Sequence, residues 1–370
     1  MQERVVYFLG AGFSQPRGLP VMSNFIDKSK ELYRLNPKDH DFVEILSKIA
    51  STAIATKYFK ADLNNIEEIL SILEMSGELE PQPEEGESTV ESFRKYIADV
   101  ISAYTPPIEP VQQIEGRGDW GEYVFGDDSV WKDYGQFVAS LHNLTIGMYE
   151  KGGHPYLGWQ QTRNTETRYD VISLNYDCVL ETVCDFLNRH SQHAEYSLRF
   201  QRTESDTSAS ELGLPWLAKL HGSVDKPEDI IPPTWSKTLD KAIKEQWRVA
   251  HQLLSEANHI RVLGYSLPTS DAYVQYLLKS SLVRAERETF VPLKTFHVIT
   301  LDSDGKTLDR YKGFVNFRGF QFANIKIEKY FQRIEPEKER SSTGRRGVEF
   351  QFITLEDTHS EFMQEYGTQS

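Results

Sequence analysis

An apolar segment leads into two glycines close to the start of the sequence: Val5-Val6-Tyr7-Phe8-Leu9-Gly10-Ala11-Gly12-Phe13-Ser14. An apolar run that leads directly into two glycines is typical of a buried strand followed by a tight turn. Glycine lacks a Cβ, so the backbone can turn sharply and its amides can approach an anionic diphosphate. Ser14 would add a hydroxyl donor. The usual dinucleotide fingerprint has a third glycine where this chain has Gln15. The turn alone therefore leaves nucleotide binding and a simple strand-to-helix connection open.

Two later strands carry polar side chains at their carboxyl ends. The apolar strand 169–174 is followed by Asn175 and Asp177, and the strand 216–221 ends in His221-Gly222. Ligands of open α/β sheets bind outside the carboxyl ends of the strands. We therefore expect these side chains and the glycine turn to surround one crevice.

Alternation of strands and helices after residue 165 predicts the fold class. The strand 260–263 precedes a helix over 271–286, and the strand 296–301 ends at Asp302. This pattern is typical of an α/β Rossmann-like domain, a mostly parallel sheet with helices on both faces. We assign residues 1–25 and 165–330 to this domain, 26–164 to a helical insertion with irregular loops that interrupts it, and 331–370 to a C-terminal extension.

Helical spacing of apolar residues predicts the elements of the insertion. We expect helices over 25–35, 41–58, 63–75 and 131–151. Acidic or Pro- and Gly-rich composition predicts irregular segments over 77–91, 105–128 and 335–347. Alternation over 314–334 predicts edge strands, and 348–355 predicts another short strand.

The chain resembles the sirtuin superfamily, specifically its sirtuin-like NAD-hydrolysing branch of bacterial anti-phage defence systems. The resemblance covers residues 1–25 and about 165–305. It rests on motifs whose order and approximate spacing agree: Gly10-Ala11-Gly12-Phe13-Ser14 with Gly18-Leu19-Pro20, Leu174-Asn175-Tyr176-Asp177, His221-Gly222 and Gly264-Tyr265-Ser266-Leu267-Pro268.

The resemblance implies a role for each motif. The turn of Gly10, Ala11, Gly12 and Ser14 would hold the NAD diphosphate. Asn175 would bind the hydroxyls of the nicotinamide ribose, Asp177 would meet the carboxamide, and His221 would be the catalytic base. Gly264 and Ser266 would lie beside the adenosine half.

Each of these residues also has a structural interpretation. His221 could hydrogen-bond the neighbouring backbone, and Asn175 and Asp177 could cap the helix that begins near Cys178. Ser266 and Asp271 could shape a turn and cap the next helix, with capping favoured for Asp271. Asp302 could contact adenosine or only end its strand.

Departures from the family pattern argue against a protein deacylase. Leu174 stands where deacylases usually carry Gln, and Val21-Met22 stand where they carry an acidic-aromatic-basic run. Deacylases also usually hold a four-cysteine zinc module, whereas this chain has two cysteines, Cys178 and Cys184. We expect no metal, and we expect both cysteines to be thiols in a reducing cytoplasm.

Composition bounds the remaining classes. A chain of 370 residues with 39% hydrophobic content can build a large core, and we expect a cytoplasmic globular protein without a signal peptide or a membrane span. A net charge of −14 argues against direct nucleic-acid binding.

The resemblance implies an NAD glycohydrolase that acts in anti-phage abortive infection and uses NAD as its substrate. It also implies a homo-oligomer switched by a partner, either a HerA-type ATPase or an Argonaute-like protein. Two alternatives stay open: an NAD-dependent deacylase or ADP-ribosyltransferase, and a non-catalytic module that senses NAD or ADP-ribose.

Overall fold

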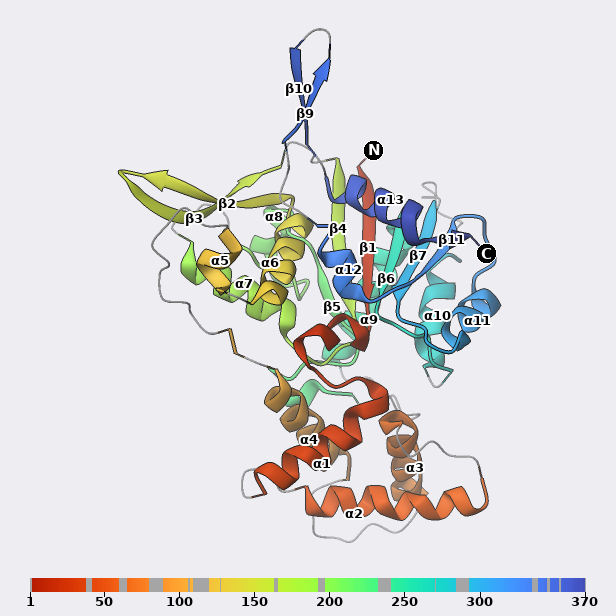
Figure 1. Ribbon diagram of the computed structural model, residues 1–370. Helices are drawn as coiled ribbons and strands as arrows, with labels where there is room; N and C mark the ends of the chain where they lie inside the picture. Colours follow the sequence, from red (N-terminus) through yellow and green to blue (C-terminus); the bar gives the residue numbers. More distant parts are fainter. Residues whose placement is uncertain are drawn as a thin grey trace.

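A seven-stranded sheet forms the centre of the protein, with strand order β11-β8-β7-β6-β1-β4-β5 (Figure 1). The structure is a computed structural model that describes the chain except residues 1, 38–41, 60–64, 80–88, 106, 109–119, 127, 163–165, 192–196, 232–240, 270, 284–292, 335–338, 345–346, 353 and 370. The strands of the sheet are β1 (Glu3–Leu9), β4 (Thr167–Ser173), β5 (Leu217–Lys219), β6 (His259–Leu263), β7 (Thr295–Thr300), β8 (Phe320–Asn324) and β11 (Thr368–Gln369).

Strand direction confirms the predicted Rossmann-like fold class. Strands β5, β4, β1, β6, β7 and β8 are parallel, and only the short β11 runs antiparallel to its neighbour β8. Numbered along the chain, the parallel strands follow the order 3-2-1-4-5-6 of doubly wound sheets. The order reverses between β1 and β6. This switch point is where such sheets form a crevice at their carboxyl edge.

Helices cover both faces of the sheet because successive residues of β1 point to opposite sides. Val5, Tyr7 and Leu9 belong to one buried cluster, and Val6 and Phe8 to the other. The first face carries α6 (Ser129–Leu141), α7 (Val179–His190), α12 (Ile327–Phe331) and α13 (Leu355–Tyr366), and the second carries α9 (Lys241–Glu256), α10 (Ala272–Ser281) and α11 (Lys306–Phe314).

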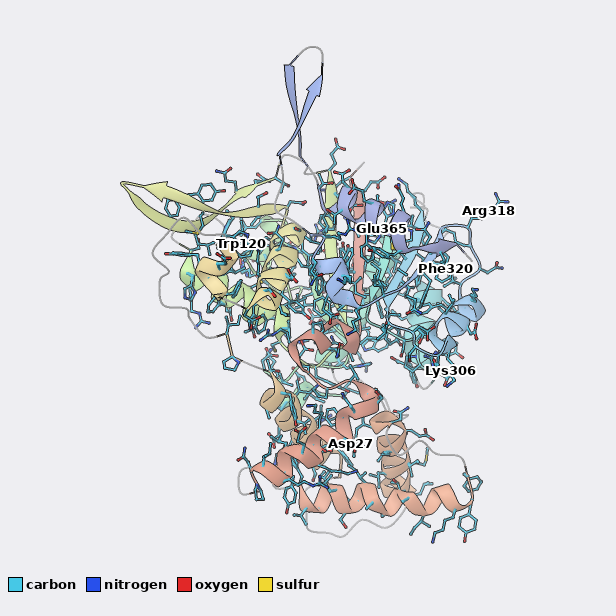
Figure 2. The ribbon with its side chains drawn as sticks, viewed as in Figure 1. Asp27, Trp120, Lys306, Arg318, Phe320 and Glu365 are labelled. Carbon is cyan, nitrogen blue, oxygen red and sulfur yellow. The ribbon has the colours of Figure 1, made fainter. Side chains whose placement is uncertain are left out.

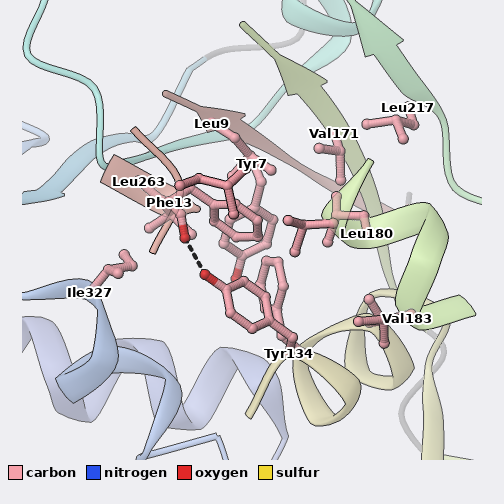
Figure 3. Packing of buried hydrophobic residues seen from close by; sticks show 14 of the residues in the cluster. Tyr7, Leu9, Phe13, Tyr134, Val171, Leu180, Val183, Leu217, Leu263 and Ile327 are labelled. Atoms are coloured by element: carbon pink, nitrogen blue, oxygen red, sulfur yellow. Dashed lines mark hydrogen bonds between the residues drawn. The ribbon is translucent and has the colours of Figure 1, made fainter. Parts of the chain in front are cut away.

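Aromatic packing on the first face fixes the glycine turn (Figure 3). The ring of Tyr7 meets Phe137 edge to face at 5.1 Å, and Phe13 meets Tyr134 in the same way at 5.3 Å. The Tyr134 hydroxyl also donates to the Phe13 carbonyl. Helix α6 thus stabilises the turn that follows β1, although it comes from the segment that we expected to be an insertion.

The first four helices form a bundle beyond the carboxyl ends of the sheet strands (Figure 1). They are α1 (Phe25–Leu35), α2 (Val43–Ser51), α3 (Ile66–Leu79) and α4 (Thr89–Tyr104), with a 3-10 turn over Thr52–Lys57 after α2. The rings of Phe25, Phe42 and Phe93 pack around Tyr96. Arg94 joins the bundle to the sheet domain, because its Nε donates to the Ile230 carbonyl at 2.8 Å. The predicted helices over 25–35, 41–58 and 63–75 thus have observed counterparts.

The prediction of one helix over 131–151 is wrong in its second half. Helix α6 ends at Leu141, and Leu144–Lys151 is strand β2, paired antiparallel with β3 (His154–Gln161). Asn143 adopts a left-handed φ of 54°, which ends the helical path. Leu144 and Ile146 are buried while the residues between and after them are not, so a strand's period of two replaces the helical period.

The C-terminal part also differs from expectation. The stretch 314–334 contains one strand, β8, followed by helix α12 rather than a second strand. Within the predicted loop 335–347 lies β9 (Glu339–Gly344), which pairs with β10 (Gly347–Phe352) in a hairpin that projects from the body (Figure 1). Helix α13 and strand β11 then return to the sheet. The extension is therefore part of the sheet domain.

Several shorter elements complete the described chain. They are α5 (Trp120–Phe125), α8 (Thr207–Glu211) and 3-10 turns over Ala11–Phe13, Gln15–Arg17, Met22–Asn24 and Pro227–Asp229. Helices α3 and α4 extend into the predicted irregular segment 77–91, and α5 lies in 105–128. The rest of both segments falls mostly outside the described residues. Figure 2 shows side chains on these elements, with Asp27 of α1 and Trp120 of α5 among those labelled. Among the helices described, none has the length and apolar character needed to cross a membrane.

Candidate functional site

The turns after β1 and β6 touch each other at the switch point of the sheet. Leu9 lies level with Leu263, so Gly10 and Gly264 leave the sheet side by side. The Gly12 amide donates to the Gly264 carbonyl at 2.9 Å, and a Cβ on Gly12 would lie 2.9 Å from the Gly264 Cα. Gly264 itself has a φ of +66°. Both positions need glycine, because the two backbones could not otherwise approach so closely.

Backbone bonds limit how this turn can hold a phosphate. The amide of Gly10 donates to Leu263 at 3.0 Å, and those of Gly12, Phe13 and Ser14 also donate to carbonyls. Ala11 is the exposed residue of the turn. The glycines therefore act first by allowing close packing, and the exposed Ala11 is the part of the turn open to solvent.

Asn175 lies against the same turn. It is buried after β4, and its Nδ2 donates to the Gly10 carbonyl at 3.0 Å and to the Ser14 Oγ at 3.1 Å. The expected alternative, capping of α7 by Asn175, is not what the side chain does. The structure thus brings together the first two sequence motifs through Asn175 and Ser14.

Asp177 serves both the turn and the helix. Its Oδ1 accepts the Val179 amide at 3.1 Å, so it satisfies the first free amide of α7 from the position before the N-cap residue Cys178. Its carboxylate also accepts a hydrogen bond from Ser14. Burial raises the pKa of Asp177, while the positive charge of Lys219, the Ser14 hydrogen bond and the Val179 amide oppose that rise.

His221 completes the group from the neighbouring strand. It is 4% exposed, and its Nδ1 lies 3.1 Å from the Leu174 carbonyl. A carbonyl can only accept, so Nδ1 carries the proton and the basic lone pair lies on Nε2. His221 therefore contacts the backbone, as the structural interpretation expects, and its Nε2 is buried.

The residues expected beside adenosine behave differently from one another. Ser266 is exposed, close in sequence to Gly264. The buried Asp302 carboxylate accepts the amides of Thr307 at 3.2 Å and Leu308 at 2.9 Å, so it caps α11. Asp271 precedes α10 without capping it, and accepts the Tyr265 hydroxyl at 2.9 Å instead.

Sequence reasoning missed Lys219, the last residue of β5. Its side chain is 3% exposed and donates to the Asp177 carbonyl and to the Ser223 Oγ. The available signal was a lysine inside an apolar strand, two residues before His221. Lys219 also lines a cavity of about 150 Å³ together with Gly222, Ser223 and Gln246.

Both cysteines are free thiols, and both follow the Leu174–Asp177 motif in the sequence. Cys178 is half-buried, with its Sγ 3.2 Å from the Ser223 Oγ, and Cys184 is buried within α7. Within the described part of the chain, no group of three or more His, Cys, Asp or Glu side chains is arranged to hold a metal ion.

The fold and the site define a Rossmann-type α/β protein with a cluster of buried polar side chains at the carboxyl edge of its sheet, beside the switch point. Residues 170–315 match the family described as SIR2-like domain. This segment of the chain is therefore similar to that domain family. The matched segment contains Asn175, His221 and Gly264, and the turn at Gly10 lies outside it.

The chain also shows a weak similarity to a solved structure described as Sir2Tm bound to a propionylated peptide. The similarity covers 90% of this chain and 92% of that chain, with 13% sequence identity and a TM-score of 0.33. A similarity this distant assigns no ligand or residue role. No curated protein matches the sequence significantly.

Proposed function

We propose that the protein is an NAD glycohydrolase that cleaves NAD to nicotinamide and ADP-ribose. One observation carries the proposal: Asn175 and Asp177, which follow β4, both contact Ser14 of the turn after β1, beside the switch point. His221, which follows the neighbouring β5, contacts the Leu174 carbonyl next to Asn175. The SIR2-like match over residues 170–315 supports NAD as the substrate.

The chemistry of the N-glycosidic bond suits these side chains. As the bond breaks, nicotinamide leaves with the bonding electron pair as a neutral ring, and positive charge develops on the ribose carbon. No strong acid is needed. The protein must hold the ribose and the carboxamide and support the cationic carbon.

Each side chain then has a defined task. The Nδ2 of Asn175 is engaged by Gly10 and Ser14, so its Oδ1 is the atom that accepts a ribose hydroxyl. The Asp177 carboxylate accepts the carboxamide N–H. Water adds to the ribose carbon while the Nε2 of His221 takes its proton and later releases it to solvent.

The test is nicotinamide release by the purified chain. We expect Asn175→Ala and His221→Ala each to reduce the rate by about a hundred- to ten-thousand-fold, the usual contribution of a general base or a positioned polar group. Ser266→Ala, at the exposed adenosine side, should lose far less. Turnover within about threefold of wild type in both of the first two variants would refute the assignment.

The second candidate is an NAD-dependent protein deacylase or ADP-ribosyltransferase. The same crevice would serve, and incubation with NAD and acylated or unmodified protein substrates would reveal transfer. A third candidate, a non-catalytic NAD or ADP-ribose sensor, predicts binding of NAD without any release of nicotinamide.

We also propose a biological setting. An active NAD hydrolase in the cytoplasm would kill its own cell, so the enzyme should be restrained until infection. We propose that it self-associates and that a HerA-type ATPase or an Argonaute-like protein switches it on as an effector of anti-phage abortive infection. The resemblance to defence-associated sirtuin-like proteins motivates this setting.

A further inference from the structure

The ammonium group of Lys219 lies buried behind the proposed catalytic group. Removing an ammonium from water is costly unless acceptors replace the water. Lys219 has three: the Asp177 carbonyl, the Ser223 Oγ at 2.8 Å and the Glu181 carboxylate at 3.4 Å. All of its protons can therefore be donated, which makes a charged lysine tolerable at this depth.

These acceptors join the two segments that carry the proposed catalytic residues. Asp177 follows β4, and Ser223 follows β5 and His221. Ser173 of β4 is paired with Lys219 in the sheet, so the lysine lies at the base of both segments. A backbone bond from Val224 to the Tyr176 carbonyl, at 2.9 Å, ties the same segments further along.

Charge is the second effect of Lys219. Burial raises the pKa of Asp177, and Lys219 is the largest of the influences that lower it again. Asp177 must be ionised to accept the carboxamide N–H as a carboxylate. Loss of the lysine charge would shift Asp177 toward its neutral form.

We propose that Lys219 is a positioning residue of NAD cleavage, which fixes Asp177 against the His221–Ser223 segment and keeps its carboxylate charged. The proposal rests on the proposed function. Lys219 acts through Asp177 and does not itself touch the substrate.

The first test is the pH profile of nicotinamide release by Lys219→Met. We expect at least a tenfold fall in kcat and a shift of the acid limb to higher pH, because Asp177 then protonates more readily. Lys219→Arg should restore part of the rate. Lys226→Met is the matched control, since Lys226 is exposed on the same segment, and its rate should stay within twofold. A folded K219M with turnover within threefold and an unmoved acid limb would overturn the proposal.

The second test needs no enzymatic activity. Burial raises the pKa of the Cys178 thiol to about 11, and the charge of Lys219 is the largest influence opposing that rise. We expect K219M to slow alkylation of Cys178 by iodoacetamide at pH 8 roughly tenfold, equivalent to one pKa unit. Mass spectrometry separates Cys178 from the buried Cys184.

These readouts distinguish two kinds of failure. If the wild-type chain releases no nicotinamide alone or with its partner, the proposed function fails, and slower alkylation still supports the electrostatic role of Lys219. Equal alkylation rates in wild type and K219M overturn that role. If K219M does not fold, as judged by circular dichroism, Lys219→Gln replaces it, because Gln keeps a donor and lacks the charge.

Discussion

A chain of buried polar side chains fastens the C-terminal helix to the sheet. The His359 Nε2 of α13 lies 2.8 Å from the His297 Nδ1 of β7, and its Nδ1 lies 3.1 Å from the Tyr330 hydroxyl. The chain continues to Tyr7, whose hydroxyl accepts from Arg261 at 2.8 Å. Neutral histidines suit this arrangement, because an imidazolium would face the nearby guanidinium.

Both histidines should make the fold sensitive to acid. Burial first, and the charge of Arg261 second, hold the pKa of His359 well below its usual value and lower that of His297 to about 4. The unfolded chain then binds protons more readily than the folded one. Stability is therefore complete above about pH 6.5 and falls as the pH drops from there toward about 4.

We expect His359→Gln to flatten this dependence. The wild-type free energy of unfolding should fall with acidification by up to about 1.4 kcal/mol per pH unit for His359. The variant should be less stable at pH 7 but lose less between pH 6.5 and 4.5 in urea titrations. Buried His142 also has a lowered pKa and contributes to the pH dependence of both proteins. The comparison is therefore between the slopes of unfolding free energy against pH in wild type and variant. Identical slopes would contradict this account.

The residues of the site were predictable from sequence to different degrees. Asn175 and His221 follow strands that local pattern identifies, so their place at the sheet edge could be predicted. The burial of Lys219 could not, because its acceptor is the backbone of Asp177, which only the tertiary fold brings near. The sequence also left two roles open for Asp302, contact with adenosine or the end of its strand. Its observed role depends on the amides of α11, which the strand pattern does not reveal.

Among the elements, the turns after β1 and β6 pack closely against each other at the switch point. A Cβ on Gly264 would lie 2.3 Å from the Phe13 nitrogen and 2.4 Å from the Gly12 carbonyl carbon. Both contacts are to backbone, which cannot move aside without disturbing the first turn.

Gly264→Ala should therefore destabilise the fold and abolish NAD binding. Gly305→Ala is the matched control: its φ is +79°, and nothing lies within 4 Å of the added Cβ. In the control, the free energy of unfolding should fall only by the cost of placing alanine in a left-handed conformation, about 1–2 kcal/mol. In denaturant titration, Gly264→Ala should lower the free energy of unfolding clearly more than Gly305→Ala does. Equal losses would show that the two turns can separate freely.

Elements with a strong local pattern were predicted well, and elements that depend on a distant partner were not. Helix α1 was expected over 25–35 and begins and ends there. Strand β2 was read as helix because Leu144 and Met148 also fit a four-residue spacing. The segment is a strand because it pairs with β3. The spacing of its own apolar residues does not indicate that such a partner follows.

At the scale of the whole molecule, one sheet domain is assembled from segments far apart in sequence. Helix α6 of the expected insertion and helix α13 of the expected extension both pack on the first face of the sheet. The bundle of α1–α4 lies beyond the carboxyl edge and is joined there through Arg94 and Ile230.

We expect the whole protein to fold without zinc. Its only cysteines, Cys178 and Cys184, lie six positions apart at the start and in the middle of α7, and neither belongs to a metal-binding group of described residues. Incubation with a chelator should leave the melting temperature unchanged, and elemental analysis should find no stoichiometric zinc. One zinc ion per chain, lost together with stability on chelation, would disprove this.

Release of free nicotinamide from NAD is the most direct readout of the proposed reaction. The purified chain should be assayed over a wide range of concentration, with its mass in solution recorded, alone and with the protein encoded beside it. We expect release of nicotinamide and ADP-ribose in equal amounts, at a rate that rises with self-association or with the partner and is lost in Asn175→Ala and His221→Ala. Absence of release under all of these conditions, or release that survives both substitutions, would contradict it.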